Sequence, residues 1–289
     1  MTTQITSQLS EPDFESYREN GYFIAEGALT LSEIDDIRND AVSICRGTYG
    51  PVPGIEEPEP GETDDQIIAK YICIHHPQKK SGVIAKYLAH PAIVGPLTSV
   101  IGPNVKCTQS MLFIKASGKP GQAWHQDENF LATRDRSLTA AWIALDDATT
   151  ENGCIWVIPG SHKSGILWPT RETTDDRFDC ADEAVGFPYG DDDAIPVEVS
   201  TGSIVFFNGY LLHRSLPNRA PNGYRRALVN HYMSAESLYP NSFEFPVERA
   251  DNRDIIMVVG VDPYAYKGIE NRMKTQVRPE RMGGCKWIE

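Results

Sequence analysis

Six short apolar runs in the second half of the sequence constrain its fold most strongly. Each is rich in β-branched and aromatic residues, and Gly, Pro, Asn or Asp residues bound them. The runs are residues 105–116, 138–148, 153–161, 195–200, 202–215 and 225–235. Because no long helical pattern separates them, they predict an antiparallel sandwich or barrel rather than a parallel sheet with alternating helices.

The residues before this region have the apolar spacing of helices. Residues 11–46 predict two helices that flank a short extended run at 21–24. Residues 82–101 return to helical spacing, but Pro91 and Pro96 interrupt the pattern and predict two short helices. We therefore expect a mainly β core with flanking helices.

A chain of 289 residues lies near the upper limit for one hydrophobic core, so a single domain over residues 1–289 is expected. Within it we expect a helical part at about residues 11–104 and a β core at about 105–235. Residues 236–289 form a C-terminal extension that carries few periodic signals. We expect mixed loops and short elements there.

Two segments combine many acidic residues with little apolar content. Residues 51–65 hold four prolines and six acidic residues, which predicts a mobile loop. Residues 171–194 hold nine acidic residues and interrupt the series of strands. This second segment is either a solvated surface insertion or a lid over a site, and both interpretations stay open.

Charge and hydropathy exclude several classes of partner. The chain has 27 basic and 40 acidic residues, and its net charge of −13 opposes binding to nucleic acid or anionic membranes. No apolar run approaches the roughly 18 to 20 residues that cross a bilayer. The polar start of the chain also lacks the pattern of a secretory signal. We expect neither a nucleic-acid nor a membrane partner.

The number and spacing of the cysteines indicate the cellular compartment in which the protein works. The chain has six, scattered singly with no CxxC pair, which is typical of free thiols in a reducing cytosol. A zinc site built from thiolates is correspondingly disfavoured, since such sites usually take two ligands from one short turn. We expect a cytoplasmic protein, while its oligomeric state is not indicated.

The motif at residues 124–127, Trp-His-Gln-Asp, provides the first candidate metal ligands. In an extended segment, residues i and i+2 point the same way, so His125 and Asp127 can converge on one ion. An imidazole and a carboxylate supply two of the three ligands of the facial triad that leaves open positions on iron(II). The pair alone is a weak signal and needs its context.

His213 provides a candidate third ligand. It follows the apolar run from Ser203 to Leu212, and the strands of a barrel can bring it close to Asp127. A lone histidine at the end of an apolar strand is otherwise more often a hydrogen-bonded structural residue. Its place opposite the HxD pair favours the ligand interpretation.

Two adjacent arginines open the run that follows His213. Because neighbouring strand residues face opposite sides, only one of Arg225 and Arg226 can point into a barrel. A buried guanidinium needs a carboxylate, and its planar fork suits a small dicarboxylic acid. The alternative places both arginines on the surface.

Five blocks in a fixed order carry a family resemblance. They are WHQD at 124–127, AWIALDDAT at 141–149, NGCIWVIPGSHK at 152–163, GSIVFFNGYLLHRSLPN at 202–218 and YRRALVNHY at 224–232. Over roughly residues 14–235, and most strongly from 105 onward, the chain resembles the phytanoyl-CoA dioxygenase family. The resemblance implies a double-stranded β-helix, a cupin-like jelly roll with helices packed outside.

The resemblance also implies an iron centre. Its motif positions make His125, Asp127 and His213 the ligands of Fe(II). The reaction implied consumes 2-oxoglutarate and O₂, releases succinate and CO₂, and hydroxylates an unactivated C–H bond. Ascorbate is the expected reductant in vitro. Asp127 disfavours halogenation, because related halogenases have a small apolar residue in its place.

Four further residues match positions near the cosubstrate. Arg225 matches the arginine that pairs with the far carboxylate of 2-oxoglutarate, and Ser215 matches a hydroxyl that supports it. Trp142 and Gln109 match positions close to the same molecule. The chain departs from the family at Ser203, where an acidic residue is common.

His162 also falls in a matching block, in the turn at residues 159–162, but we interpret it as a structural loop residue.

The substrate is less well defined. A coenzyme A thioester would require a basic surface, and the sequence offers only Lys79, Lys80 and the run from Lys115 to Lys119. A small metabolite is therefore expected. Desaturation, epimerisation or cyclisation would need the same residues as hydroxylation.

Two other classes of function remain open. One is a jelly roll that binds a small molecule without catalysis. The other is a zinc or manganese cupin enzyme that does not use 2-oxoglutarate. Arg225 favours the oxygenase, because neither alternative gives it a purpose.

Overall fold

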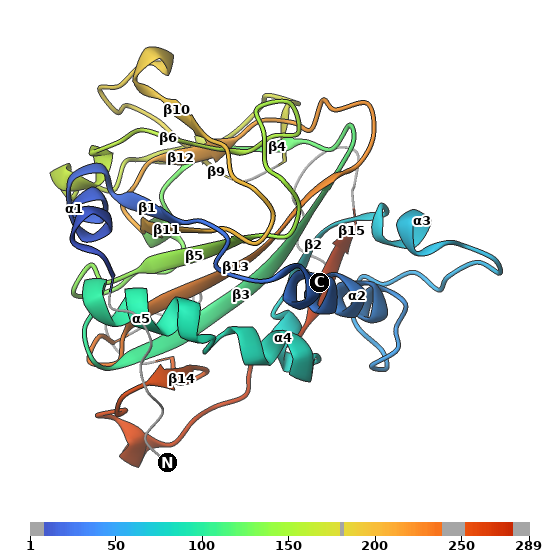
Figure 1. The fold of residues 1–289 in the computed structure, drawn as a ribbon, viewed down its shortest axis with the longest axis horizontal. Helices are drawn as coiled ribbons and strands as arrows, with labels where there is room; N and C mark the ends of the chain where they lie inside the picture. Colours follow the sequence, from blue (N-terminus) through green and yellow to red (C-terminus); the bar gives the residue numbers. More distant parts are fainter. Residues whose placement is uncertain (1–8, 180–181, 239–251, 280–289) are drawn as a thin grey trace.

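The structure is a computed structural model that describes residues 9–179, 182–238 and 252–279. Two β-sheets face each other, and helices cover the outer side of the larger sheet (Figure 1). The described strands pair antiparallel, apart from one short parallel pair, β4 with β8. This arrangement confirms the expected mainly β jelly roll with flanking helices.

The large sheet contains strands from all parts of the sequence. Its order is β1 (Tyr22–Ala25), β11 (Ile204–Asn208), β5 (Thr139–Ala144), β13 (Tyr224–Ser234), β3 (Val105–Ala116), β2 (Tyr71–His75) and β15 (Gln276–Pro279), with β14 (Ile256–Val259) paired to β3. Strand β2 comes from the part expected to be helical, and β14 and β15 come from the C-terminal extension. The sheet therefore extends beyond the β core that the sequence predicted.

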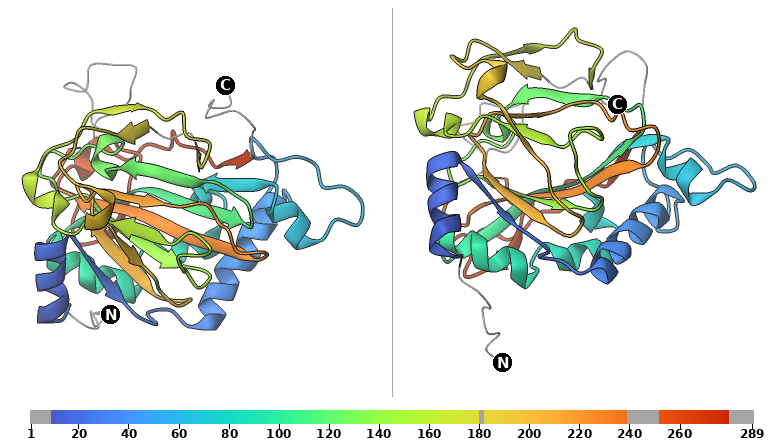
Figure 2. Two further views of the ribbon diagram at one scale, coloured as in Figure 1. Left: turned by 90° about the horizontal axis from the view of Figure 1, so that it is seen from above. Right: turned by 45° about the horizontal axis from the view of Figure 1, so that its top comes forward.

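The small sheet lies across from the large one. Its order is β10 (Ile195–Val197), β6 (Ile155–Val157), β12 (His213–Ser215), β4 (Gly121–His125) and β8 (Phe178–Asp179). A separate hairpin joins β7 (Thr170–Glu172) to β9 (Asp182–Ala184). Figure 2 shows the two layers from two further directions.

In the described part of the chain, five α-helices precede the β core. They are α1 (Glu11–Asn20), α2 (Leu31–Cys45), α3 (Asp64–Ile68), α4 (Gly82–Tyr87) and α5 (Pro91–Val100). The start of α2 is fixed by a capping box, in which Thr30 and Glu33 satisfy each other's backbone N–H groups. The expected break at Pro91 occurs, but α5 continues through Pro96, which is buried in the helix.

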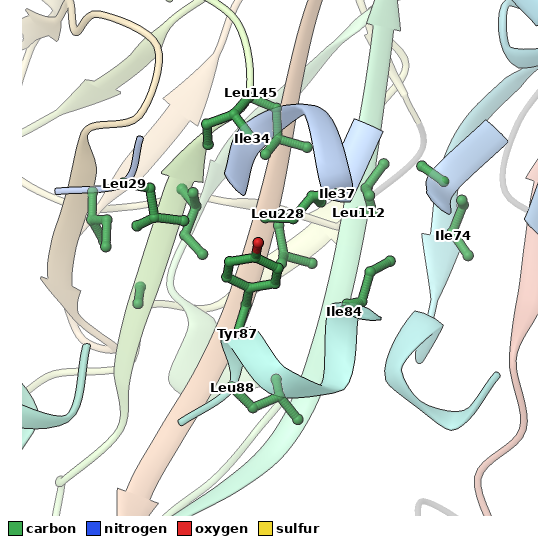
Figure 3. Packing of buried hydrophobic residues seen from close by; sticks show 14 of the residues in the cluster. Leu29, Ile34, Ile37, Ile74, Ile84, Tyr87, Leu88, Leu112, Leu145 and Leu228 are labelled. Carbon is green, nitrogen blue, oxygen red and sulfur yellow. The ribbon is translucent and has the colours of Figure 1, made fainter. Parts of the chain in front are cut away.

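The helices bury their apolar faces against the outer side of the large sheet. Ile34 and Ile37 of α2 and Ile84 of α4 pack with Leu112 and Leu228 of the sheet (Figure 3). All five side chains are completely buried. This layer contains most of the apolar core, so it supplies most of the hydrophobic stabilisation.

The residues that alternate with these along the strands of the large sheet face the small sheet and form a second cluster. Ala227 and Val229 of β13 and Trp142 of β5 meet Ile155 and Val157 of β6. The alternation along each strand thus separates an outer, helix-covered face from an inner face that lines the space between the sheets.

The run at 202–215 is the main correction to the predicted strands. It forms two strands in different sheets, β11 and β12, joined by a turn at Gly209. A Cβ on Gly209 would lie only 2.8 Å from the side chain of Leu138 and 3.0 Å from the carboxyl of Glu128, so any other residue would clash there. His213 therefore opens a strand of the small sheet rather than ending the run from Ser203 to Leu212.

The acidic segment at 51–65 has no regular structure before α3 begins at Asp64. It is tied to the body at Val52, which is buried, and at Pro53, whose carbonyl accepts from Val277. The expected mobility of this loop stays a prediction.

Candidate active site

Strands β4 and β12 bring the three predicted metal ligands together. His125 ends β4, Asp127 opens the short 3₁₀ helix Asp127–Asn129, and His213 opens β12 directly opposite His125. One ligand atom from each residue lies within 4.8 Å of the other two. Asp127 Oδ1 is 3.7 Å from His125 Nε2 and 3.6 Å from His213 Nε2.

Backbone carbonyls orient both imidazole rings. Nδ1 of His125 lies 2.8 Å from the carbonyl of Ala123, and Nδ1 of His213 lies 2.9 Å from that of Leu211. Because a carbonyl only accepts, each Nδ1 carries the hydrogen, and each Nε2 of a neutral ring offers its lone pair. Burial, together with the nearby His213, lowers the pKa of His125 to about 3. The His125 ring is thus neutral and suited to bind a metal.

Asp127 supplies the negative charge of the cluster. Burial raises the pKa of its carboxyl, but the nearby rings of His213 and His231 outweigh this and hold the pKa below its usual range. His231, on the inner face of β13, lies with Nε2 3.1 Å from Asp127 Oδ2. His231 was not predicted from the sequence, although it lies on the same face of β13 as Arg225.

These three residues fit a divalent iron ion. Two neutral imidazole nitrogens and one carboxylate oxygen form the donor set of the facial triad, and all three residues are buried. The carbonyls behind the imidazoles provide the outer support that such ligands usually have. An octahedral ion bound here would keep three positions for other ligands.

Arg225 lies on the inner face of β13 and Arg226 on the outer face. Arg226 forms two hydrogen bonds of 2.9 and 2.7 Å to the Asp146 carboxylate. Arg225 is 4% exposed, and its Nε donates to the carbonyl of Gly153 at 3.1 Å. Its guanidinium carbon is 5.4 Å from the centre of the Trp142 ring.

A second buried cation, Lys115 of β3, lies beside Arg225. The two residues are partners in the β13–β3 ladder, and burial followed by the charge of Arg225 lowers the pKa of Lys115 well below its usual value. The Lys115 amine donates to the Ser215 hydroxyl at 2.9 Å and to the Leu216 carbonyl at 2.7 Å. Within the described residues, neither cation forms an ion pair. Lys115 is therefore buried, and the basic surface run expected from Lys115 to Lys119 does not include it.

The other predicted cosubstrate residues separate into two groups. Ser215 and Trp142 lie beside Lys115 and Arg225. Gln109, in contrast, is opposite His231 in the β13–β3 ladder, six residues along β13 from Arg225. The inner face of β13 therefore carries Arg225 near one end and, six residues further on, His231 beside the Asp127 carboxylate.

Two further residues named from the sequence lie outside this cluster. The ring of His162 meets the backbone carbonyl of Arg18 at 3.1 Å, which agrees with a structural loop residue. Ser203 accepts a hydrogen bond from the backbone of Gly27 and supports the turn before β11.

The second acidic segment supplies the edge strand β8 to the small sheet and packs on the outer face of that sheet. Ala184 and Ala194 contact a cluster that includes Trp124 and Leu212, the chain neighbours of His125 and His213. Asp191 pairs with Arg214 at 3.0 Å. The segment thus covers the side of the small sheet opposite to His125, and these contacts do not support the lid interpretation.

A double-stranded β-helix with a buried cluster of two histidines and one carboxylate defines a class, the jelly-roll proteins with a mononuclear metal centre. The chain belongs to the phytanoyl-CoA dioxygenase (PhyH) family, whose sequence model matches residues 17–227.

The similarity extends to curated and solved relatives. Phytanoyl-CoA dioxygenase 1 of Oryza sativa subsp. japonica is 40% identical over 129 residues, which span 44% of each chain, less than half of the relative's length. The non-heme monooxygenase ThoJ in its apo form is 21% identical, with a TM-score of 0.65 over 86% of this chain and 84% of that one. The epimerase SnoN in complex with Fe3+, alpha ketoglutarate and nogalamycin RO is 18% identical, with a TM-score of 0.62 over 94% and 96%. Both solved structures therefore have the same fold as this chain.

Proposed function

We propose that the protein is an iron(II)- and 2-oxoglutarate-dependent oxygenase that hydroxylates a C–H bond of a small metabolite. The observation that carries this proposal is the buried His125–Asp127–His213 cluster, together with two buried basic residues on the inner face of the large sheet, Arg225 and Lys115, that lack a carboxylate partner among the described residues. The SnoN complex, which has the same fold, contains both Fe3+ and alpha ketoglutarate. Iron, 2-oxoglutarate and O₂, when bound, supply the oxidising chemistry and yield succinate and CO₂.

The protein's own residues would hold and orient these groups. His125, Asp127 and His213 would hold the iron through two imidazole nitrogens and one carboxylate oxygen, which are fewer donors than an iron ion accepts. Arg225 would donate to the far carboxylate of 2-oxoglutarate, with the ring of Trp142 beside its guanidinium. Burial of these residues would keep bulk water away from the reacting atoms.

The burial and pairing of the basic residues support a small metabolite as substrate. Lys115 is buried and donates to the Ser215 hydroxyl, and Lys79 pairs with Asp254. Lys119 is 9% exposed. These three lysines therefore do not form an exposed basic patch for the phosphates of a coenzyme A thioester, and the net charge of −13 opposes such a ligand further. We propose hydroxylation, with the alternatives of desaturation, epimerisation and cyclisation distinguished by the product.

We propose the cytoplasm as its location. Four of the cysteines, Cys45, Cys73, Cys107 and Cys154, are buried free thiols, while Cys180 and Cys285 lie outside the described residues. Among the helices that the structure describes, none has the length and apolar character needed to span a bilayer.

Turnover of 2-oxoglutarate tests this function. The purified protein with iron(II), 2-oxoglutarate, ascorbate and O₂ should release succinate even without its substrate, and an Asp127→Ala variant should not. N-oxalylglycine, an unreactive analogue of 2-oxoglutarate, should raise the unfolding temperature of the metal-loaded protein. If N-oxalylglycine does not change the unfolding temperature of the metal-loaded protein and no succinate is released, the protein would instead be a cupin metalloenzyme or a non-catalytic binding protein.

A further inference from the structure

Strand β13 places a third buried histidine behind the metal cluster. His231 is 5% exposed, and its Nε2 lies 3.1 Å from Asp127 Oδ2. The other carboxylate oxygen, Oδ1, faces Nε2 of His125 and Nε2 of His213. The two oxygens of Asp127 therefore have different neighbours, one directed at the metal position and one directed away from it.

The geometry points to a positioning role for His231: its Nε2–H donates to Asp127 Oδ2 and so makes the carboxylate bind iron through Oδ1 alone. This inference rests on the proposed iron centre. A carboxylate that is free to rotate can bind a metal through both oxygens and would then occupy a position that the cosubstrate or O₂ requires. Holding Oδ2 on His231 keeps that position open.

The hydrogen-bonding groups define the direction of this bond. The oxygen of an ionised carboxylate only accepts, so Nε2 of His231 must carry the hydrogen. Nδ1 of the same ring is buried and has no hydrogen-bond partner among the residues that the structure describes. The Asp127 carboxylate is thus the one described hydrogen-bond partner of the His231 side chain.

The local backbone aims the ring at Asp127. The β13–β3 ladder changes register at His231, since His231 pairs with Gln109 whereas Tyr232 pairs with Cys107. Thr108 is the extra residue of this bulge, and its hydroxyl lies 3.4 Å from the carbonyl of His231. A bulge redirects the side chains beside it, and bulges are frequent next to active sites.

Three substitutions at one position separate the hydrogen bond from simple packing. The amide nitrogen of glutamine reaches about as far as a histidine Nε2, so His231→Gln keeps the donor. His231→Leu fills a similar volume without a donor. His231→Asn keeps an amide but is too short to reach Asp127.

The dissociation constant for Fe(II) is measured anaerobically without 2-oxoglutarate, together with the unfolding temperature of the metal-free protein. We expect His231→Leu and His231→Asn to weaken iron binding about 10- to 100-fold and His231→Gln to restore most of it, as for other outer partners of metal ligands. Wild-type iron affinity in the folded Asn variant, or equal losses in Gln and Asn, would overturn the role of His231. Failure of the wild-type protein to bind iron would instead overturn the proposed function.

Discussion

The inner and outer faces of strand β13 differ in whether their basic side chains have acidic partners. On the outer face, Arg226 is matched by Asp146, and the hydroxyl of Tyr232 donates to the carbonyl of Leu88. On the inner face, Arg225 lies beside a second cation, Lys115, and neither has a carboxylate partner among the described residues. A buried charge without a partner is costly, so it marks the face where a ligand is expected.

The small sheet repeats this contrast on β12. Arg214, on its outer face, lies over the ring of Trp124 at 4.5 Å and pairs with Asp191. Its neighbour His213, on the inner face, turns Nε2 toward Asp127. In both sheets, an arginine on the outer face has an acidic partner within the protein, whereas its neighbour on the inner face faces the space between the sheets.

The largest effect is expected from neighbouring substitutions on β12. His213→Ala removes a metal ligand and should weaken iron binding at least about 1,000-fold, since even outer partners of ligands contribute 10- to 100-fold. Arg214→Met, one residue along on the outer face, should leave iron affinity unchanged. Equilibrium titration of both variants with iron(II) makes the comparison, and a loss of iron affinity in Arg214→Met would break the distinction between the faces.

The two arginines of β13 give the next contrast. Arg225→Met should weaken 2-oxoglutarate binding about 100-fold or more, because two charge-assisted hydrogen bonds are lost, without lowering stability. Arg226→Met leaves Asp146 with fewer partners and should cost about 1 to 3 kcal/mol of unfolding free energy, with 2-oxoglutarate binding intact. Calorimetric titration and chemical denaturation distinguish these effects, and a reversed pattern would contradict the assigned faces.

Replacement of residues 171–194 by a short Gly-Ser linker sharpens the comparison for the small sheet. The change uncovers Trp124 and Leu212 on its outer face and should lower the unfolding free energy by about 2 to 3 kcal/mol. Succinate release per folded molecule should persist. Stable protein that has lost all turnover would restore the lid interpretation.

The smallest effect concerns the pH dependence of stability. Burial lowers the pKa of His75 to about 3, against about 6.5 in an unfolded chain. Between these values the unfolded state binds the extra proton, so the free energy of unfolding should fall as the pH drops below about 6.5, by up to about 1.4 kcal/mol per pH unit.

Denaturant titrations of the metal-free protein at several pH values measure this slope. His75→Gln should make it shallower, while His162→Gln, at a less buried site, should change it less. Equal slopes in the wild-type protein and His75→Gln would show that this histidine is not buried in its neutral form.

The sequence predicted best what is encoded within one strand or by a short motif. The HxD spacing predicted that His125 and Asp127 lie together, and the parity of β13 predicted that Arg225 and Arg226 lie on opposite faces, while the family resemblance selected Arg225 as the inner one. The separation of β11 from β12 was missed, because the turn at Gly209 depends on contacts with the distant residue Leu138.

Residues whose environment is set by tertiary packing were also missed. Lys115 resembled a surface lysine in the sequence, and its burial follows only from the pairing of β3 with β13. The position of the 171–194 segment depends on two small residues, Ala184 and Ala194, packing on the outer face of the small sheet. Neither fact has a local sequence signal.

An anaerobic titration of the metal-free protein with iron(II) and then 2-oxoglutarate tests the central claim most directly. Chelation of iron by the 2-oxo acid at the His125–Asp127–His213 cluster should produce a visible metal-to-ligand charge-transfer band that saturates at one equivalent of each. The same band should be absent in His213→Ala and should require far more 2-oxoglutarate in Arg225→Met. A folded wild-type protein that binds iron(II) but gives no such band at saturating 2-oxoglutarate would contradict the account.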